Sequence, residues 1–275
     1  MTLCVAALCE DRKTIVLAAD KMISQGFIQA ELQVEKIASI HSDWWVMFAG
    51  SVPDIFDILD EARAKLAESE HHDILDVVPV VEECYRRKRL RLAEANYLVP
   101  RGWSIAQFQA SGRSSLGDAY FQNLDNAIAT YVLGLDLMVA GFDSSGVAHL
   151  FNVGNPGLAA RRDIPGYHAI GNGWIGALYF MFYRAMSTSM GATESLYHVF
   201  EAQSFGYEAG GIGEETDFIV ARFGCEPVRL QENSMPELAE LWVQFCPQPV
   251  SGLQERLGHY LAPLERTPNL GDASP

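Results

Sequence analysis

The chain has 275 residues, 49% of them apolar, and this composition is typical of a globular protein with a substantial core. Its formal net charge of −15 argues against a broad nucleic-acid-binding face. The five cysteines are scattered, and no pair has the spacing of zinc ligands. We therefore expect reduced, mostly buried thiols, with no cofactor and no metal site.

The sequence gives no sign of export or membrane insertion. Its N-terminus lacks the basic start and the full-length apolar run of a signal peptide. The longest apolar run, Trp174 to Tyr183, stops at Arg184 and is too short to cross a bilayer. We expect a soluble, cytoplasmic protein with no membrane partner.

The predicted elements come in alternating blocks of strands and helices. Strands are predicted first at 3–9, 14–19, 36–40 and 44–48, and a helix follows at 53–68. The pattern then stays mainly helical from 74 to 128. Strands return at 137–141 and 147–153, then helices at 174–186 and 193–205, and a strand at 217–223.

This order predicts an α+β fold, a four-layer αββα sandwich with two antiparallel sheets between helical layers, and not a doubly wound sheet. The sandwich is assigned to residues 1–226. Residues 227–275 read as a C-terminal extension, with short helices at 236–245 and 253–261 and a loose tail from 267.

Four residues near the N-terminus are informative in combination, although each is ordinary when considered alone. Thr2 opens the first strand, Asp20 ends the second, Lys36 begins the third, and Gly50 follows the fourth. Taken singly, these are a residue after the start codon, a strand end, a surface lysine and a turn glycine.

In combination they resemble the β-subunits of the proteasome, which are N-terminal-nucleophile (Ntn) hydrolases, and also the simpler bacterial homologue of the proteasome. The resemblance covers roughly residues 2 to 225. The motifs that carry it are Thr2, Ile15-Val16-Leu17-Ala18-Ala19-Asp20, Lys36-Ile37, Phe48-Ala49-Gly50-Ser51, Val139-Ala140-Gly141-Phe142-Asp143, Leu150-Phe151-Asn152-Val153 and Ala169-Ile170-Gly171-Asn172-Gly173.

The spacings from Asp20 to Lys36 and from Lys36 to Gly50 match the family, whereas Thr2 to Asp20 is two residues longer. An insertion of two residues in a hairpin keeps every side chain on its own face, because side chains alternate with period two.

The resemblance implies a threonine nucleophile. Once Met1 is removed, the α-amino group of Thr2, with a reference pKa of about 7.7–8.0, can take the proton of its own hydroxyl. Lys36 would add positive charge that favours the alkoxide, and Asp20 would orient Lys36. The Gly50 N–H would bind the oxyanion.

Two positions depart from the family pattern. The family has serine where this chain has Asn172, in the middle of a Gly-x-Gly turn. Asparagine can also donate and accept hydrogen bonds, but Asn172 reads equally well as a cap of the next helix. The family's acid and serine before its last strand have no clean match in Gly210–Thr216.

Outside this site the main feature is a basic run. Arg86, Arg87, Lys88, Arg89 and Arg91 lie within six positions of a predicted helix, and we expect part of the run to pair with Glu82, Glu83 and Glu94. A docking patch is the alternative. Cys4 and Cys9 read as core thiols, and His71-His72 lacks further metal ligands.

The sequence thus favours a threonine peptidase that cleaves peptide bonds of peptides or unfolded proteins inside a homo-oligomeric ring or helical stack. The segment Ile74–Ile128 is expected to contribute to that assembly, and an ATP-dependent unfoldase is a further candidate partner. Two alternatives stay open. One is a proteasome-like scaffold that has lost turnover, and the other is an amidase or acyl transferase on the same fold.

Overall fold

The computed structural model describes residues 2–25, 28–31, 35–50, 52–67, 73–207, 215–231, 233 and 235–246. Ser51, His71, His72, the loop from Gly210 to Glu214 and the predicted elements beyond residue 246 lie outside these residues. By internal contacts the chain divides into two compact units, Met1–Leu238 and Ala239–Pro275. The domain boundary predicted at residue 226 stays a prediction.

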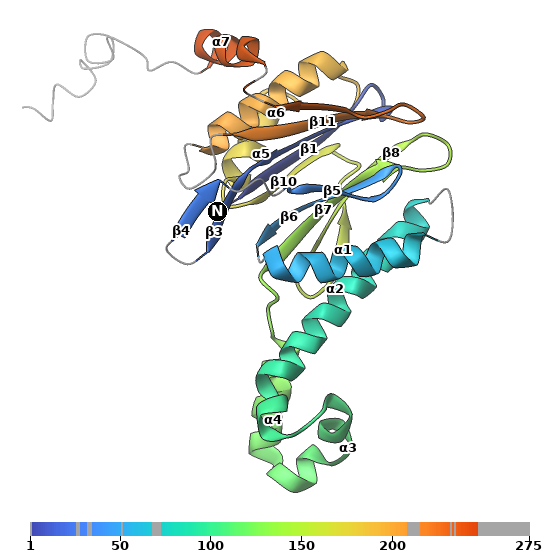
Figure 1. The fold of residues 1–275 in the computed structure, drawn as a ribbon, viewed down its shortest axis with the longest axis vertical. Helices are drawn as coiled ribbons and strands as arrows, with labels where there is room; N and C mark the ends of the chain where they lie inside the picture. Colours follow the sequence, from blue (N-terminus) through green and yellow to red (C-terminus); the bar gives the residue numbers. More distant parts are fainter. Residues whose placement is uncertain are drawn as a thin grey trace, which may run out of the picture. The chain divides into compact units, whose positions relative to one another are not determined.

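Two five-stranded antiparallel sheets form the centre of the first unit (Figure 1). The first sheet has the order β10-β1-β2-β11-β12 and contains β1 (Leu3–Cys9), β2 (Thr14–Asp20), β10 (Tyr167–Gly171), β11 (Thr216–Arg222) and β12 (Val228–Gln231). The second has the order β5-β6-β7-β8-β9 and contains β5 (Ile37–His41), β6 (Trp44–Gly50), β7 (Leu135–Phe142), β8 (Ala148–Gly154) and β9 (Leu158–Arg161).

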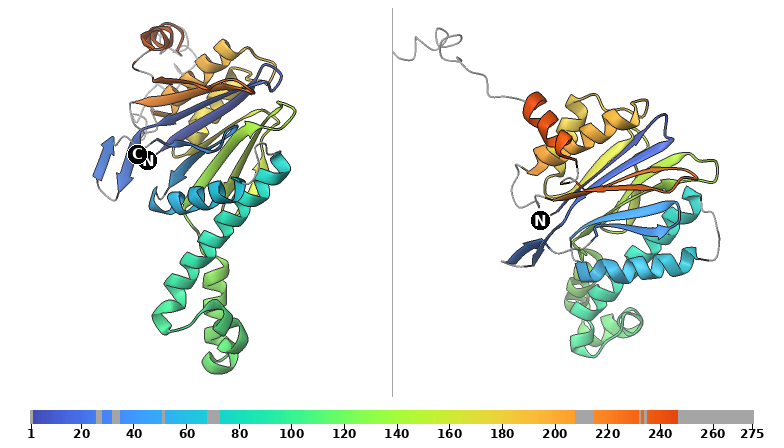
Figure 2. Two further views of the ribbon diagram at one scale, coloured as in Figure 1. Left: turned by 45° about the vertical axis from the view of Figure 1, so that its right-hand side comes forward. Right: turned by 45° about the horizontal axis from the view of Figure 1, so that its top comes forward.

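Helices cover the outer face of each sheet (Figure 2). Helices α5 (Trp174–Tyr183) and α6 (Ala192–Tyr207) lie on the first sheet, and α1 (Val52–Leu66) and α2 (Ile74–Tyr97) lie on the second. The predicted αββα sandwich of two antiparallel sheets between helical layers is therefore confirmed.

The layers follow from the alternation of side chains along the strands. In β1, Cys4, Ala6 and Leu8 join the core between the sheets. In β6, Trp45 and Met47 face the same core, whereas Trp44, Val46 and Phe48 pack under α1 and α2. Because β1 and β2 are covered on both faces, all their residues are buried, and their sequences are almost continuously apolar.

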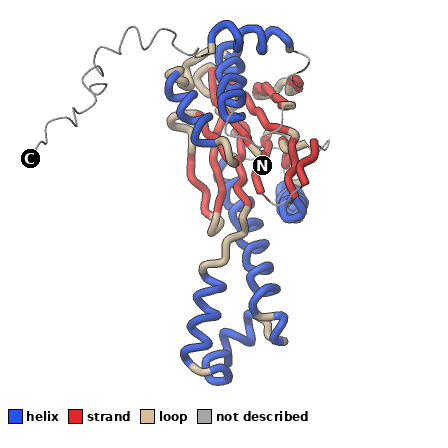
Figure 3. The backbone as a smooth tube through the Cα atoms, turned by 90° about the vertical axis from the view of Figure 1, so that its left-hand side faces the viewer, coloured by secondary structure: helices blue, strands red, loops and turns tan. Residues whose placement is uncertain are grey.

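The far half of α2 projects away from the sandwich, together with the turn η1 (Val99–Arg101), α3 (Ile105–Leu116) and α4 (Asp118–Ala129) (Figure 3). A small separate core of Leu98, Phe108 and Leu124 holds these helices together. A short hairpin of β3 (Met22–Gln25) and β4 (Ile28–Glu31) follows β2, and α7 (Pro236–Phe245) is the last described helix.

Candidate active site

Thr2 directly precedes β1, and hydrogen bonds of its main chain hold it in place. Its carbonyl oxygen accepts a hydrogen bond from the Asn172 N–H at 2.8 Å. The next amide, that of Leu3, donates to Asp20 Oδ1 at 2.8 Å. Both polar groups of the Thr2–Leu3 peptide are therefore bound, and the direction of the Thr2 side chain is fixed by its backbone.

Lys36 brings the predicted charged residues together around the Thr2 hydroxyl. Its Nζ donates to Thr2 Oγ1 and to Asp20 Oδ1, each at 2.9 Å. The side chains of Lys36 and Asp20 are 2% and 0% exposed. Burying a charge is costly unless it is paired and hydrogen-bonded, so each of the two residues needs the other.

Gly50 ends β6 opposite Leu135, with φ of 123°, a conformation that side chains disfavour. A Cβ at Gly50 would lie 2.2 Å from the Gly134 carbonyl oxygen, so only glycine fits. Gly171 has φ of 95°, and a Cβ there would lie 2.0 Å from the Thr2 carbonyl oxygen and 3.4 Å from the Ala49 Cβ. Gly171 thus allows the Thr2 main chain and Ala49 of β6 to approach each other, whereas Gly50 lies against Gly134 and stays solvent-exposed.

Asn172 reaches Thr2 through its main chain, as the N–H that binds the Thr2 carbonyl. The alternative role as a helix cap is wrong, because α5 begins after Gly173 and has no side-chain cap bond. From the unmatched loop, Glu215 and Thr216 are described. Thr216 is buried opposite Asp20, and the Glu215 carbonyl accepts from the Lys21 N–H at 3.0 Å. That end of the loop therefore lies next to Asp20.

Gln203 of α6 was missed by the sequence analysis. It is 3% exposed, and its Nε2 donates to the Leu3 carbonyl oxygen at 3.1 Å. A signal was present, because Gln203 is the polar member of an otherwise apolar helical stripe with Val199 and Gly206.

Cys4 lies two residues after Thr2 and is fully buried, as predicted for a core thiol. Burial raises the pKa of its thiol to about 12, and the nearby Lys36 charge offsets only part of that effect. Cys9 is also buried, and burial raises its pKa to about 11. Both thiols stay protonated near neutral pH, which disfavours them as nucleophiles.

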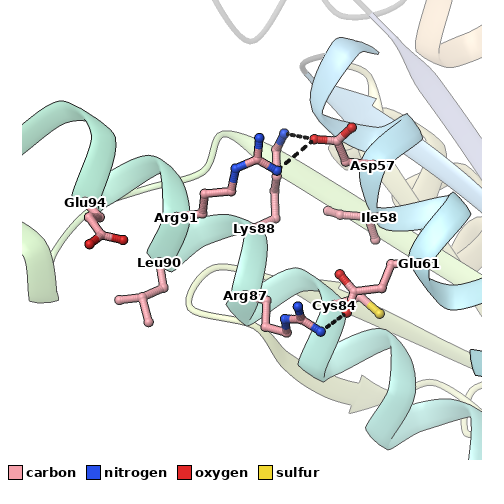
Figure 4. Close-up of a pocket in the computed structure, with 9 residues that line it drawn as sticks. All are labelled: Asp57, Ile58, Glu61, Cys84, Arg87, Lys88, Leu90, Arg91 and Glu94. Atoms are coloured by element: carbon pink, nitrogen blue, oxygen red, sulfur yellow. Dashed lines mark hydrogen bonds and ion pairs between the residues drawn. The ribbon is translucent and has the colours of Figure 1, made fainter. Parts of the chain in front are cut away.

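The basic run lies on α2, where it borders a pocket of about 310 Å³ against α1 (Figure 4). Arg87 meets Glu61 at 2.6 Å, and Lys88 meets Asp57 at 2.6 Å. The expected pairing of Arg86 with Glu82 is confirmed at 3.3 Å.

The other two expected acids have different partners. Glu83 pairs with Lys65 at 2.9 Å, and Glu94 accepts from the Ile105 N–H at 2.8 Å. Pairing with Glu83 and Glu94 is therefore wrong. The packing of α1 against α2 supplies the acidic partners, so much of the run is neutralised within the chain.

Within the described ranges, every helix is too short or too polar to cross a membrane. The same residues contain no group of three or more histidine, cysteine, aspartate or glutamate side chains arranged to hold a metal ion.

Comparisons with known proteins agree on the fold. Residues 2–105 match the model of the proteasome subunit family. The matched range runs from Thr2 to the first residue of α3 and so contains Thr2, Asp20, Lys36 and Gly50. No curated protein sequence matches the chain significantly.

Among solved structures, Anbu (ancestral beta-subunit) from Yersinia bercovieri superposes with a TM-score of 0.61 at 12% identity, over 98% of this chain and 99% of that one. An Anbu (Gly-1) mutant from Hyphomicrobium sp. strain MC1 gives a TM-score of 0.61 at 13% identity, over 98% and 100%. The chain therefore has the proteasome-like Ntn fold, and the resemblance inferred from the sequence is confirmed.

Proposed function

We propose that this proteasome-like chain is a threonine-type N-terminal-nucleophile hydrolase that cleaves amide bonds, with Thr2 as nucleophile after removal of Met1. The observation that carries the proposal is the position of the Lys36 ammonium, 2.9 Å from both the Thr2 hydroxyl and the Asp20 carboxylate. A buried cation donating to a threonine hydroxyl favours the alkoxide over the alcohol.

In the proposed reaction the free α-amine of Thr2 takes the proton from Oγ1, and Oγ1 forms a bond to the carbonyl carbon of the substrate. The carbonyl electrons move onto oxygen, where the Gly50 N–H would donate to the oxyanion. The carbon–nitrogen bond then breaks, and the leaving amine receives the proton from the Thr2 ammonium. Water hydrolyses the resulting ester, which restores the hydroxyl and releases the acid.

The other predicted residues act around this step. Asp20 holds the Lys36 ammonium and the Leu3 amide at once, so it fixes both the cation and the strand that carries Thr2. The main chain of Asn172 holds the Thr2 carbonyl. Preorganised donors of the Gly50 kind are worth about 3–4 kcal/mol of barrier each.

We further propose that the substrates are peptides or unfolded proteins, that the reaction takes place in the cytoplasm inside a homo-oligomer, and that an unfoldase partner would supply unfolded chains. Helix α5 supports self-association because it carries no charge between Trp174 and Tyr183. Five of its large side chains are 44–76% exposed, namely those of Trp174, Ile175, Tyr179, Phe182 and Tyr183.

Together these side chains expose on the order of 600 Å² of mostly apolar surface. That is at the upper end of the largest patch found on monomers, and it approaches the roughly 800 Å² that each partner buries in a stable interface. Because much of the basic run is neutralised inside the chain, α5 is a better candidate than α2 for the contact between copies.

The nucleophile is tested with a peptide epoxyketone, which requires both the hydroxyl and the free amine of an N-terminal threonine. The intact mass before reaction gives the fraction of protein without Met1. We expect one adduct on Thr2 in that fraction, none in Thr2→Ala, and an unchanged adduct in the exposed control Thr193→Ala. Met1-free protein that stays unmodified at saturating reagent supports the alternative of an inactive scaffold. A panel of peptide, amide and acyl-acceptor substrates separates a peptidase from an amidase or acyl transferase.

Self-association is tested by light scattering coupled to size exclusion. We expect a mass of many protomers, reduced by Phe182→Glu and unaffected by Ile164→Glu, which places the same charge on an isolated exposed residue. A mass near 30 kDa at micromolar concentration would refute the assembly.

A further inference from the structure

The residue that follows the nucleophile is bound by side chains where a strand would ordinarily use backbone partners. The Leu3 N–H donates to the Asp20 carboxylate at 2.8 Å, and the Leu3 carbonyl accepts from Gln203 Nε2 at 3.1 Å. Asp20 is also the partner of Lys36. The Leu3 N–H is therefore bound by a carboxylate that also holds Lys36. The Leu3 carbonyl is bound by a neutral amide from a helix 200 residues later in the chain.

Helix α6 holds Leu3 a second time, through shape. Gly206 lies three residues after Gln203, so both are on the same face of the helix. A Cβ at Gly206 would lie 2.3 Å from Leu3 Cδ2 and 3.3 Å from the Gly173 carbonyl oxygen. The absence of a side chain at Gly206 thus makes the space that the Leu3 side chain fills, and Leu3 is completely buried.

Glutamine is an energetically unfavourable residue at position 203. Its side chain is buried, and within the described part of the chain Oε1 has no hydrogen-bond partner. A buried amide oxygen without a partner costs roughly 1–3 kcal/mol, whereas methionine would fill a similar volume without that cost. Packing alone does not account for glutamine here, and the only hydrogen bond of its side chain among the described residues goes to Leu3.

We infer that Gln203 is a positioning residue for the nucleophile: with Gly206 it fixes Leu3, and through Leu3 it fixes the place of Thr2 relative to Lys36. This inference rests on the proposed function of Thr2. Gln203 acts through Leu3 and does not touch the reacting atoms. A displacement of about 1 Å at a reacting group can cost on the order of 100-fold in rate, so one hydrogen bond at the adjacent residue has a measurable effect.

The main test is Gln203→Met, with Gln122→Met on the exposed face of α4 as the matched control. Epoxyketone labelling of Met1-free protein gives two quantities: an amplitude, which reports folded and competent protein, and a rate constant, which reports the reactivity of Thr2. We expect Gln203→Met to keep the amplitude and the melting temperature of the wild type while its rate constant falls roughly tenfold. With a peptide substrate, kcat should fall and KM should stay within twofold, because Gln203 has no substrate contact.

A conservative variant gives a readout that loss of packing would not produce. In Gln203→Glu the carboxyl donates to the Leu3 carbonyl when it is protonated and repels that oxygen when it is ionised. The labelling rate of Gln203→Glu relative to Gln203→Met should therefore rise as the pH is lowered. Gly206→Ala, which crowds Leu3 from the same helix face, should slow labelling while leaving Gln203 in place.

Hydrogen exchange separates this inference from the proposed function. Exchange in the peptide covering residues 2–9 should quicken in Gln203→Met, while exchange over Trp44–Gly50 stays unchanged. If the wild type is never labelled, the proposed function fails, and the exchange result still decides whether Gln203 holds Leu3. Unchanged labelling rate and unchanged exchange in a folded Gln203→Met would overturn the inference. So would a loss of amplitude at an unchanged rate constant.

Discussion

The two ends of β1 each carry a network of charged side chains, buried at the Thr2 end and partly buried at the other, and the networks differ in which groups they leave available. At the Thr2 end, Lys36 and Asp20 surround a hydroxyl of a half-buried residue. At the other end, Arg12 leaves the turn after β1 and reaches β8 of the second sheet. There its Nε donates to the Ala148 carbonyl at 2.8 Å, and its Nη2 meets Asp163 at 3.1 Å.

The partners at the Arg12 end are each bound from several sides. Asp163 faces His149 at 2.9 Å and also accepts from the Leu150 N–H at 2.8 Å, while the second ring nitrogen of His149 faces Asp143 at 3.1 Å. Burial works to raise the pKa of Asp163, but the hydrogen bonds from His149 and the Leu150 amide hold it below its usual value.

The turn that carries Arg12 is itself strained, because Glu10, Asp11 and Arg12 have φ of 51°, 55° and 64° without being glycine. We interpret the Arg12 network as a structural bridge between the sheets, because its donors and acceptors are hydrogen-bonded to one another. At the Thr2 end a buried cation, Lys36, donates to a hydroxyl. Buried or partly buried charge marks both places, and the proposed nucleophile Thr2 distinguishes the candidate active site.

The comparison is tested most strongly by Lys36→Ala. We expect the labelling rate of Thr2 to fall by roughly 100-fold or more, because an electrostatic donor to the reacting oxygen is lost. Stability should also fall, by about 3–5 kcal/mol, because Asp20 is left buried without its cation. Urea denaturation and epoxyketone labelling measure the two effects.

The double variant Lys36→Ala/Asp20→Asn separates them, since the asparagine oxygen can still accept from the Leu3 amide. It should regain much of the lost stability and none of the reactivity. Recovery of labelling in the double variant would contradict the role of Lys36.

The opposite result is expected for Arg12→Met at the other end of the strand. Loss of the charged hydrogen bonds to Asp163 and to the Ala148 carbonyl should lower the free energy of unfolding by about 2 kcal/mol. The labelling rate per folded molecule should stay within twofold of the wild type. Arg113→Met, on an exposed face of α3, is the control and should change stability by less than about 0.5 kcal/mol. Slower labelling in folded Arg12→Met would mean that the two ends are coupled.

A smaller effect is expected between the two ends, at His168 of β10, opposite Ala6. Burial, with the Arg162 charge, lowers the pKa of His168 to about 4 from 6.5. Below pH 6.5 His168 therefore binds a proton in the unfolded chain and stays neutral in the folded chain. The free energy of unfolding falls as the pH falls toward 4.

The loss attributable to His168 should be about 1 kcal/mol between pH 7 and pH 5.5. His168→Gln should remove that part of the slope and leave the part at lower pH that comes from the carboxylates of the Arg12 network. Parallel urea curves at several pH values measure the difference. Equal slopes in the two proteins would show that His168 is accessible to protons in the fold.

The sequence was sufficient for strongly patterned elements and for contacts along the N-terminal strands. The β1–β2 hairpin and β6 are nearly continuous apolar runs, so they were predicted within two residues. In contrast, no strand is predicted at β10, which is five residues long and ends at the first glycine of the Gly-x-Gly motif, and the four-residue strands β9 and β12 are too short to show a period. The partner of Gln203 could not be predicted, because only the packing of α6 on β1 brings it to Leu3. The same holds for the basic run, whose acidic partners depend on the neighbouring helix α1.

The smallest effect is expected from Cys4, a buried thiol close enough to Lys36 to feel its charge. Its Sγ lies 3.5 Å from the Phe48 carbonyl oxygen, and the residue is fully buried. With a pKa of about 12, roughly one thiol in ten thousand or fewer is ionised near neutral pH. Cys4→Ala should therefore leave the labelling rate of Thr2 within twofold and lower stability by about 1 kcal/mol, the cost of a small cavity. Iodoacetamide should modify native protein at the exposed Cys225 and leave Cys4 unmodified until the protein is unfolded. Alkylation of native Cys4 at a rate comparable to Cys225, with loss of epoxyketone labelling, would show that the reactive group is the thiol and not the threonine. The contrast between the two ends of β1 would then not hold.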